Sequence, residues 1–151
     1  MVLGQVFSPK TIITNLESED KDEVFEELVE SIVSVQPQLN RSAAVNALQE
    51  RESKMSTGII HAVAVPHGIV DSVRGIVGAV GISRSGIDYD ALDKAPINLI
   101  FMLLISPEER EKHLQVLSSL CKVLQNPDFV NEVIGKQSSQ EVYDFLCSFD
   151  K

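Results

Sequence analysis

The segment from Ile97 to Ile105, INLIFMLLI, is apolar at every position except Asn98. It is far too short to cross a bilayer as a helix, which takes about 20 residues. A strand with one wet face would alternate apolar and polar side chains, and this segment does not. It therefore predicts a central strand covered on both faces, which requires helices on both sides of a sheet.

Other segments provide candidates for the remaining strands and for those helices. Alternating or short apolar patterns predict further strands at 11–16, 59–65 and 75–82. Five amphipathic patterns predict helices, which begin after Asp20, Asn40, Ser106, Asn126 and Ser138. Strands and helices do not simply alternate along the chain, so an all-parallel sheet is not expected. The order predicts the α/β class, as an α/β/α sandwich of three layers around a central mixed β-sheet.

Length and charge limit the kind of molecule and the kind of partner. A chain of 151 residues without repeats or linker-like segments predicts a single domain over 1–151. The net charge of −9 argues against binding to nucleic acid or to an anionic membrane, because both favour a basic surface. The first ten residues, MVLGQVFSPK, lack the pattern of a signal peptide. Cys121 and Cys147 lie in helical apolar patterns, so we expect buried, reduced thiols in a cytoplasmic protein.

A histidine follows the strand predicted at 59–65, in the sequence Pro66-His67-Gly68. Proline fixes its own φ and lacks a backbone donor, while glycine tolerates conformations closed to other residues. We therefore expect a corner that presents His67 at the end of the sheet, where open α/β folds place their sites. From the corner alone, an ordinary turn histidine remains the commoner explanation.

Three other polar residues are candidates for the same site or for purely structural roles. His113 shares a helical face with Leu117, Leu120 and Leu124, which predicts a half-buried ring near the strand end at Ile105. From this pattern alone, a core histidine is the commoner explanation. Arg51, with the hydroxyls and glycine of Ser56-Thr57-Gly58, could bind an oxyanion, although a solvated arginine is equally ordinary. His61 falls inside the predicted strand, where a packed or edge histidine is favoured over a catalytic one.

Several other chemistries fail on spacing. The glycines at 75, 78 and 81 do not form the dinucleotide motif, and the aspartates of DYDALD lack the glycine and glutamate of a calcium loop. The two cysteines have no paired ligand for zinc, and no G-x-S-x-G nucleophile motif occurs. We therefore expect neither a metal nor a cofactor.

The sequence STGIIHAVAVPHG, at 56–68, resembles the signature of the type-2 enzyme IIA proteins of the bacterial phosphoenolpyruvate:sugar phosphotransferase system, the fructose/mannitol/nitrogen-related class. The similarity extends to Arg51-Glu52, to the segment 89–120 and to the last helix, and so covers nearly the whole chain. One departure is Ile60-His61-Ala62, where many members have Gly-Asn-Gly. That position varies within the family, so the departure blurs the subtype but not the chemistry.

This resemblance implies a function and a role for each candidate residue. His67 would accept a phosphoryl group on Nε2 from the phosphocarrier protein HPr, or from a nitrogen-branch relative. It would pass the group to an enzyme IIB component for sugar uptake, which makes the protein a phosphotransferase with a phosphohistidine intermediate. His113 matches the family's second active-site histidine, and Arg51 matches its phosphate-neighbouring arginine. The alternative is a nitrogen-related regulator in which the same histidine switches protein binding, and the sequence does not name a sugar.

Overall fold

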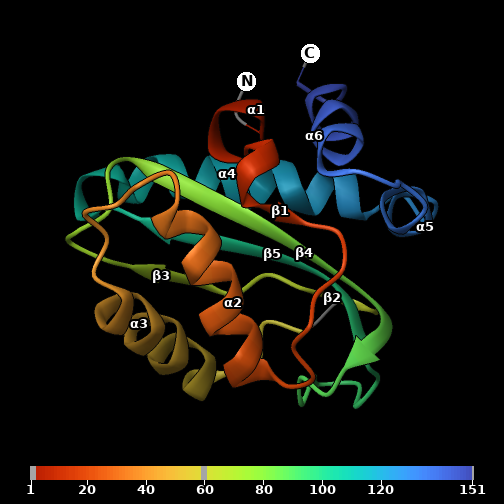
Figure 1. Ribbon diagram of the computed structural model, residues 1–151, viewed down its shortest axis with the longest axis horizontal. Helices are drawn as coiled ribbons and strands as arrows, with labels where there is room; N and C mark the ends of the chain where they lie inside the picture. Colours follow the sequence, from red (N-terminus) through yellow and green to blue (C-terminus); the bar gives the residue numbers. More distant parts are fainter. Residues whose placement is uncertain (1–2, 59–60, 151) are drawn as a thin grey trace.

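The computed structural model describes residues 3–58 and 61–150, and within them five strands form one sheet (Figure 1). The strands are β1 (Ile12–Ile13), β2 (Val63–Ala64), β3 (His67–Ile69), β4 (Ile76–Ile87) and β5 (Ile97–Ile105). β1 pairs with β4, β4 with β5, and both β2 and β3 pair with the other side of β5. Only the β4–β5 pair is antiparallel, so the sheet is mixed, as predicted.

Helices cover both faces of this sheet, which confirms the three-layer prediction. They are α1 (Leu3–Val6), α2 (Lys21–Val33), α3 (Arg41–Lys54), α4 (Arg110–Leu124), α5 (Phe129–Ile134) and α6 (Ser139–Cys147), with single 3₁₀ turns at Pro9–Thr11 and Pro107–Glu109. Figure 1 shows α2 and α3 on one face, and α1, α4, α5 and α6 on the other.

The central strand β5 joins the two hydrophobic cores. Ile100, Met102 and Leu104 pack among the residues of α2 and α3. The alternate residues, from Leu99 to Ile105, pack among those of α1, α4, α5 and α6. Each apolar side chain buried in this way contributes roughly 1.5–3 kcal/mol, so a strand buried on both faces stabilises both layers at once.

Helix starts follow the local signals. The side chains of Asp20, Asn40 and Ser138 each accept a hydrogen bond from the backbone N–H three residues later, at 2.9, 3.0 and 3.2 Å. This satisfies one of the free N–H groups at each helix start. After Ser106, however, the first three residues form a 3₁₀ turn, and α4 begins only at Arg110.

The strand predicted at 59–65 is interrupted. Residues 59–60 lie outside the described part, His61 and Ala62 lie in a turn, and only β2 is extended. Ala62 has a φ of 67°, which ends regular pairing at that point. The placement of His61 inside a strand was therefore wrong.

The predicted corner at His67 was also wrong. β3 pairs with the same edge of β5 as β2 and in the same register, because Val63 lies opposite Leu99 and His67 lies opposite Leu103. The carbonyl of Pro66 accepts a hydrogen bond from the Leu103 N–H at 2.9 Å, so pairing with β5 runs through the proline. His67 thus lies within a strand, near the carboxyl end of β5.

Three further expectations need correction. The strand expected at 11–16 is regular only over β1, and the one expected at 75–82 runs on to Ile87 through an irregularity after Ile82. Asn98 holds this polar extension by donating from Nδ2 to the Ser83 carbonyl at 2.9 Å. Neither cysteine is buried: Cys121 is exposed and Cys147 half-buried, because neither belongs to the fully buried stripe of its helix.

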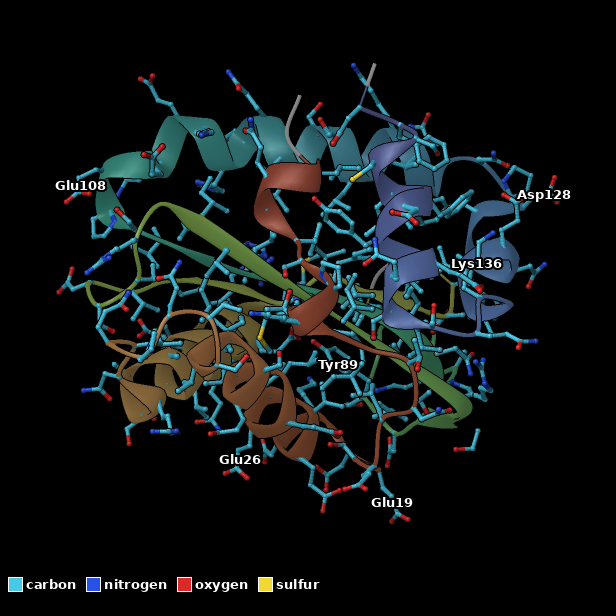
Figure 2. The ribbon with its side chains drawn as sticks, turned by 45° about the horizontal axis from the view of Figure 1, so that its top comes forward. Glu19, Glu26, Tyr89, Glu108, Asp128 and Lys136 are labelled. Atoms are coloured by element: carbon cyan, nitrogen blue, oxygen red, sulfur yellow. The ribbon has the colours of Figure 1, made fainter. Side chains whose placement is uncertain are left out.

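The exposed side of α2 carries acidic residues. Figure 2 shows Glu19 and Glu26 at the outer edge of the molecule, whereas Tyr89 lies inside, next to α2. The Tyr89 ring makes an edge contact with Phe25 of α2, with the ring centroids 6.2 Å apart. A phenol buried among apolar side chains requires a polar partner for its hydroxyl group, and this partner lies beside the candidate site.

Candidate active site

A cavity of about 340 Å³ lies at the edge of the sheet and contains all three predicted site residues. Arg51 comes from the last turn of α3, His67 from β3 and His113 from the first turn of α4. The sheet edge explains this meeting, because helices from both faces can reach a strand that pairs only with β5. The full lining is Ala47, Glu50, Arg51, Lys54, His67, Gly68, Ile69, Ile105 and His113.

A larger hollow of about 510 Å³ lies between α2 and α3 and contains none of these three residues. Arg41 and Glu30 form an exposed ion pair there, 2.7 Å from Nε to Oε2. Exposed pairs of this kind contribute little, because water and salt screen them. The candidate active site is therefore the smaller cavity, which Arg51, His67 and His113 line.

The two ring nitrogens of His67 have different surroundings. Nδ1 lies 3.0 Å from the carbonyl oxygen of Val65. A carbonyl can only accept a hydrogen bond, so a neutral ring carries its proton on Nδ1. The lone pair is then on Nε2, which leaves that nitrogen free to act as a nucleophile.

The surroundings of His67 also favour the neutral ring. Burial lowers the pKa of His67 below its ordinary value, and the positive charge of Arg51, with that of His113 when its ring is protonated, lowers it further. The hydrogen bond to Val65 and the carboxylate of Glu52 act in the opposite direction but do not reverse the shift. A neutral imidazole, and therefore a nucleophilic one, is the dominant form at neutral pH.

Gly68 sets how closely α3 approaches His67. A Cβ atom at position 68 would lie 3.0 Å from the Ala47 Cβ and 3.3 Å from the Leu48 nitrogen. The glycine is required by this close packing in an extended strand, and not by the flexible corner that the sequence suggested. The contact brings the end of α3, and Arg51 with it, beside the histidine.

Arg51 is half-buried, and its Nη1 donates to the Met55 carbonyl at 2.8 Å. The other members of the predicted oxyanion group do not line the cavity. The Ser56 hydroxyl accepts from the Gly58 N–H at 3.1 Å, and the Thr57 hydroxyl donates to Glu52. That part of the prediction was wrong, since these groups bind within the protein.

His113 has one buried and one accessible ring nitrogen. Its Nδ1 is buried and has no hydrogen-bond partner among the described residues. Burying an N–H donor without a partner is costly, so a neutral ring carries its proton on Nε2. His113 therefore presents an N–H donor where His67 presents a lone pair.

Comparison with known proteins identifies the family. Residues 5–148 match the family described as "Phosphoenolpyruvate-dependent sugar phosphotransferase system, EIIA 2". The chain belongs to this EIIA family. This EIIA chain is similar to a PTS system fructose-specific EIIA component from Haloferax volcanii, with 38% identity over 108 residues that cover 72% of this chain and 70% of the relative.

Two further relatives differ in their names. A PTS system fructose-specific EIIABC component from Bacillus subtilis is 31% identical over the whole of this EIIA chain, which spans only 24% of that relative's length. The crystal structure of the nitrogen regulatory protein IIA-Ntr from Neisseria meningitidis superimposes with a TM-score of 0.89 at 29% identity, covering 97% of this chain and 99% of that one.

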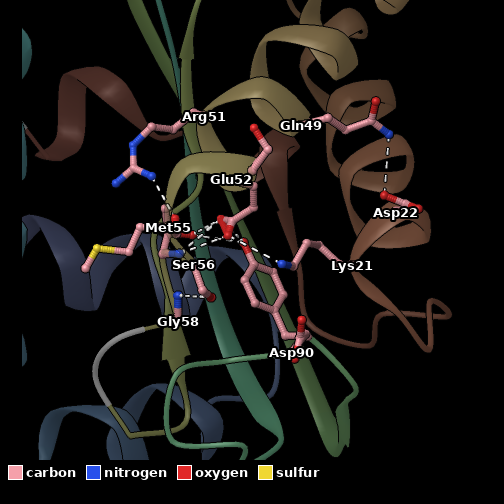
Figure 3. Close-up of polar contacts among 12 residues, drawn as sticks. Lys21, Asp22, Gln49, Arg51, Glu52, Met55, Ser56, Gly58 and Asp90 are labelled. Carbon is pink, nitrogen blue, oxygen red and sulfur yellow. Dashed lines mark hydrogen bonds and ion pairs between the residues drawn. The ribbon is translucent and has the colours of Figure 1, made fainter.

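The sequence reasoning missed Glu52, which is buried beside the site. Its Oε2 accepts from the Thr57 N–H at 2.9 Å, and its Oε1 accepts from the Tyr89 hydroxyl at 2.8 Å. Lys21 lies 3.5 Å from the same carboxylate (Figure 3). A signal was present, because Ala44, Leu48 and Glu52 are spaced four residues apart along the buried face of α3.

The remaining candidate, His61, lies outside the cavity lining and is exposed, with Nδ1 3.4 Å from Asp93. Among residues 3–58 and 61–150, no cluster of three or more histidine, cysteine or acidic side chains has a metal-binding arrangement. In the same part of the chain, no helix is both long enough and apolar enough to cross a bilayer.

Proposed function

We propose that this EIIA protein is a phosphoryl carrier that accepts a phosphoryl group on Nε2 of His67 and passes it to an enzyme IIB component in sugar uptake. The contact between His67 Nδ1 and the Val65 carbonyl carries the proposal, because it leaves Nε2 unprotonated in a cavity that Arg51 and His113 also line. Membership of the EIIA family and the fructose-specific names of two relatives support it. The Bacillus relative's name, EIIABC, supports a IIB partner.

The transfer is a displacement at phosphorus. The donor is the phosphohistidine of HPr or of a nitrogen-branch relative. The His67 Nε2 lone pair forms the new N–P bond as the donor's N–P bond breaks in line, and that bond's electrons return to the donor's ring nitrogen. His67 keeps its Nδ1 proton throughout, held by Val65. In the transfer to IIB, a nucleophilic atom of IIB forms the new bond to phosphorus as the His67 Nε2–P bond breaks, and that bond's electrons return to Nε2.

Arg51 and His113 stabilise the charge on the transferring group. The guanidinium of Arg51 and the Nε2–H of His113 are donors for its equatorial oxygens. Both residues line the cavity and both project from helix ends that are fixed by packing. Positioning and charge stabilisation are the main tasks in this chemistry, since little acid–base work is required.

The rim of the cavity suits a transient protein partner. Ile69 lines it with 41% of its surface exposed, and the exposed side chains of Met55 and Leu114 adjoin lining residues. Lys54 and Glu50 add polar groups to the same rim. Exposed apolar side chains with a polar surround are typical of weak, specific docking surfaces.

The decisive experiment is phosphorylation in vitro. Incubation with phosphoenolpyruvate, enzyme I and HPr should add one phosphoryl group that is labile in acid and stable in alkali. The variant His67→Gln should remain unlabelled under the same conditions. Labelling of that variant to the level of the parent protein would refute the proposal.

A second candidate function is favoured by the similarity to IIA-Ntr, which covers 97% of this chain and 99% of that chain. In this alternative, phosphorylation of His67 switches the binding of a protein partner. The phosphorylated protein should be mixed with a fructose-type IIB component. Rapid loss of the label to IIB supports the carrier function, whereas a stable label and no transfer support the regulatory one.

A further inference from the structure

Glu52 is a buried carboxylate that the phosphoryl-transfer mechanism does not use. Its side chain is 4% exposed, and it accepts hydrogen bonds from the Thr57 amide, the Thr57 hydroxyl and the Tyr89 hydroxyl. Lys21 balances its charge and also lies over the Tyr89 ring, 4.7 Å from the centroid. Burying a carboxylate carries a desolvation penalty, which is offset only when hydrogen bonds and an opposite charge satisfy it, as they do for Glu52.

One chain of contacts leads from Glu52 to Arg51. The carboxylate fixes the amide and hydroxyl of Thr57 and so holds the segment 55–57 back against the end of α3. The carbonyl of Met55, in that segment, accepts from Arg51 Nη1 at 2.8 Å (Figure 3). The segment anchored by Glu52 therefore fixes the direction of the guanidinium.

A second chain of contacts leads from Glu52 to His67. The carbonyl of Thr57 accepts from the Val65 N–H at 3.2 Å. The carbonyl of Val65 in turn accepts from Nδ1 of His67 at 3.0 Å. The residue that Glu52 anchors thus also holds the peptide that selects the tautomer of the nucleophile.

Tyr89 keeps the carboxylate in place. Its ring is 1% exposed and packs against Phe25, so the hydroxyl has a fixed position. Burial raises the pKa of Tyr89 well above its ordinary value, and the Glu52 carboxylate raises it further. The phenol therefore remains protonated, and thus a hydrogen-bond donor, at neutral pH.

We propose that Glu52, held by the Tyr89 hydroxyl, is a positioning residue that sets both the Arg51 guanidinium and the His67 ring for phosphoryl transfer. The inference rests on the proposed function, since it concerns the rate of that reaction. Neither Glu52 nor Tyr89 lines the cavity, so both act through other residues.

Two substitutions and one matched control test this proposal. Tyr89→Phe removes one hydroxyl, and Glu52→Gln replaces the carboxylate by an amide of equal size. Each should slow single-turnover phosphorylation by HPr by roughly tenfold or more, because small misplacements of reacting groups are costly. Tyr143→Phe should react at the parent rate, since that hydroxyl binds the Gly4 carbonyl, remote from the cavity.

A double substitution and a spectroscopic signal separate positioning from a general structural effect. If Glu52 acts through Arg51, Glu52→Gln combined with Arg51→Ala should slow transfer much less than the product of the single effects. The ¹⁵N shifts of His67 should show a smaller share of the Nδ1–H tautomer in Glu52→Gln than in the parent. Multiplicative rates together with an unchanged tautomer would overturn the inference.

The outcomes for the two proposals differ. A parent protein that neither HPr nor its nitrogen-branch relative labels refutes the phosphoryl-carrier function itself. A parent protein that is labelled, with Tyr89→Phe reacting at the same rate, refutes only the positioning role. If Glu52→Gln does not fold, Thr57→Val and Thr57→Ser replace it: the valine variant should be slow, and the serine variant, which keeps the hydroxyl, should recover the rate.

Discussion

A histidine can attack phosphorus only when one ring nitrogen has a free lone pair. At His67 the Val65 carbonyl selects which nitrogen that is, and burial keeps the ring neutral. The charge of Arg51 disfavours the protonated ring, and under the proposed function it would also attract the anionic phosphoryl group. The same local arrangement would then produce the nucleophile and receive its substrate.

Titration should show this directly. The pKa of His67, followed by NMR, should lie below the ordinary 6.5, so phosphorylation should remain fast in mildly acidic solution where a free histidine is mostly charged. Arg51→Ala should raise the pKa, because Arg51 lowers it. Because the pKa of His67 is lower in the folded protein than the ordinary 6.5 of the unfolded chain, the unfolded chain binds more protons between these two values. The free energy of unfolding is therefore highest above pH 6.5 and decreases as the pH falls toward the pKa of the folded state. A pKa at or above 6.5 in the parent would contradict this account.

His113 is predicted to act on the reaction and not on the fold. Its buried Nδ1 makes no hydrogen bond within the described residues, so His113→Ala removes no such bond there and should leave the unfolding midpoint in urea nearly unchanged. The loss of a donor to the transferring group should slow phosphorylation by about 100-fold. A large loss of stability with normal phosphorylation would instead indicate a core histidine.

At the scale of elements, the contact between β3 and α3 decides the shape of the site. α3 can lie against β3 only because position 68 has no side chain, and the contact places Arg51 beside His67. Interiors are packed too densely to absorb an extra methyl group at such a contact without a shift.

Gly68→Ala should therefore destabilise the protein by about 1–3 kcal/mol, measured by urea unfolding. It should also slow phosphorylation, because the helix end must move away from the strand. Ala47→Gly removes the facing methyl group and should reduce the effect of Gly68→Ala in the double variant. Equal effects in the two backgrounds would show that this contact is not the cause.

The elements that the sequence predicted well have local causes. β5 was predicted from its own composition, and the starts of α2, α3 and α6 from their capping residues. The breaks around β2 and β3 depend on pairing with β5, a segment distant in sequence, so no local pattern shows them. The same is true of the polar extension of β4, which Asn98 holds from the neighbouring strand.

In the candidate site, too, some residues could be predicted from local sequence and others depend on contacts between distant segments. Arg51, His67 and His113 carry a recognisable motif, and the structure brings them to one cavity. Glu52 was missed because its partners, Thr57 and Tyr89, are identified only by the fold. A charged residue on the buried face of a helix is the pattern that would have revealed it.

At the scale of the whole molecule, the two ends of the described chain are joined. The Asp150 carboxylate accepts hydrogen bonds from the backbone N–H groups of Leu3 and Gly4, at 3.0 and 2.7 Å. The Tyr143 hydroxyl adds a bond to the Gly4 carbonyl at 2.7 Å. Figure 1 shows both ends beside α1 and α6.

Asp150→Ala should destabilise the protein by about 1–2 kcal/mol, the usual cost of removing a side chain that caps free N–H groups. The rate of phosphorylation should not change, because neither α1 nor α6 lines the cavity. Asp144→Ala is the matched control, since that exposed carboxylate binds only the neighbouring Gln140 among the described side chains. Equal stability of the two variants would show that the bonds to Leu3 and Gly4 contribute nothing.

The bonds from Asp150 to the start of α1 also make the order of the elements along the chain partly dispensable. A short linker between the two ends, with new termini opened at the exposed turn Asn126–Asp128, should yield a circular permutant that retains every strand and helix. In such a molecule the segment from α3 to α4 remains uncut, and with it every residue that lines the cavity. The closed arrangement of the layers, and not the position of the first residue, is what the site requires.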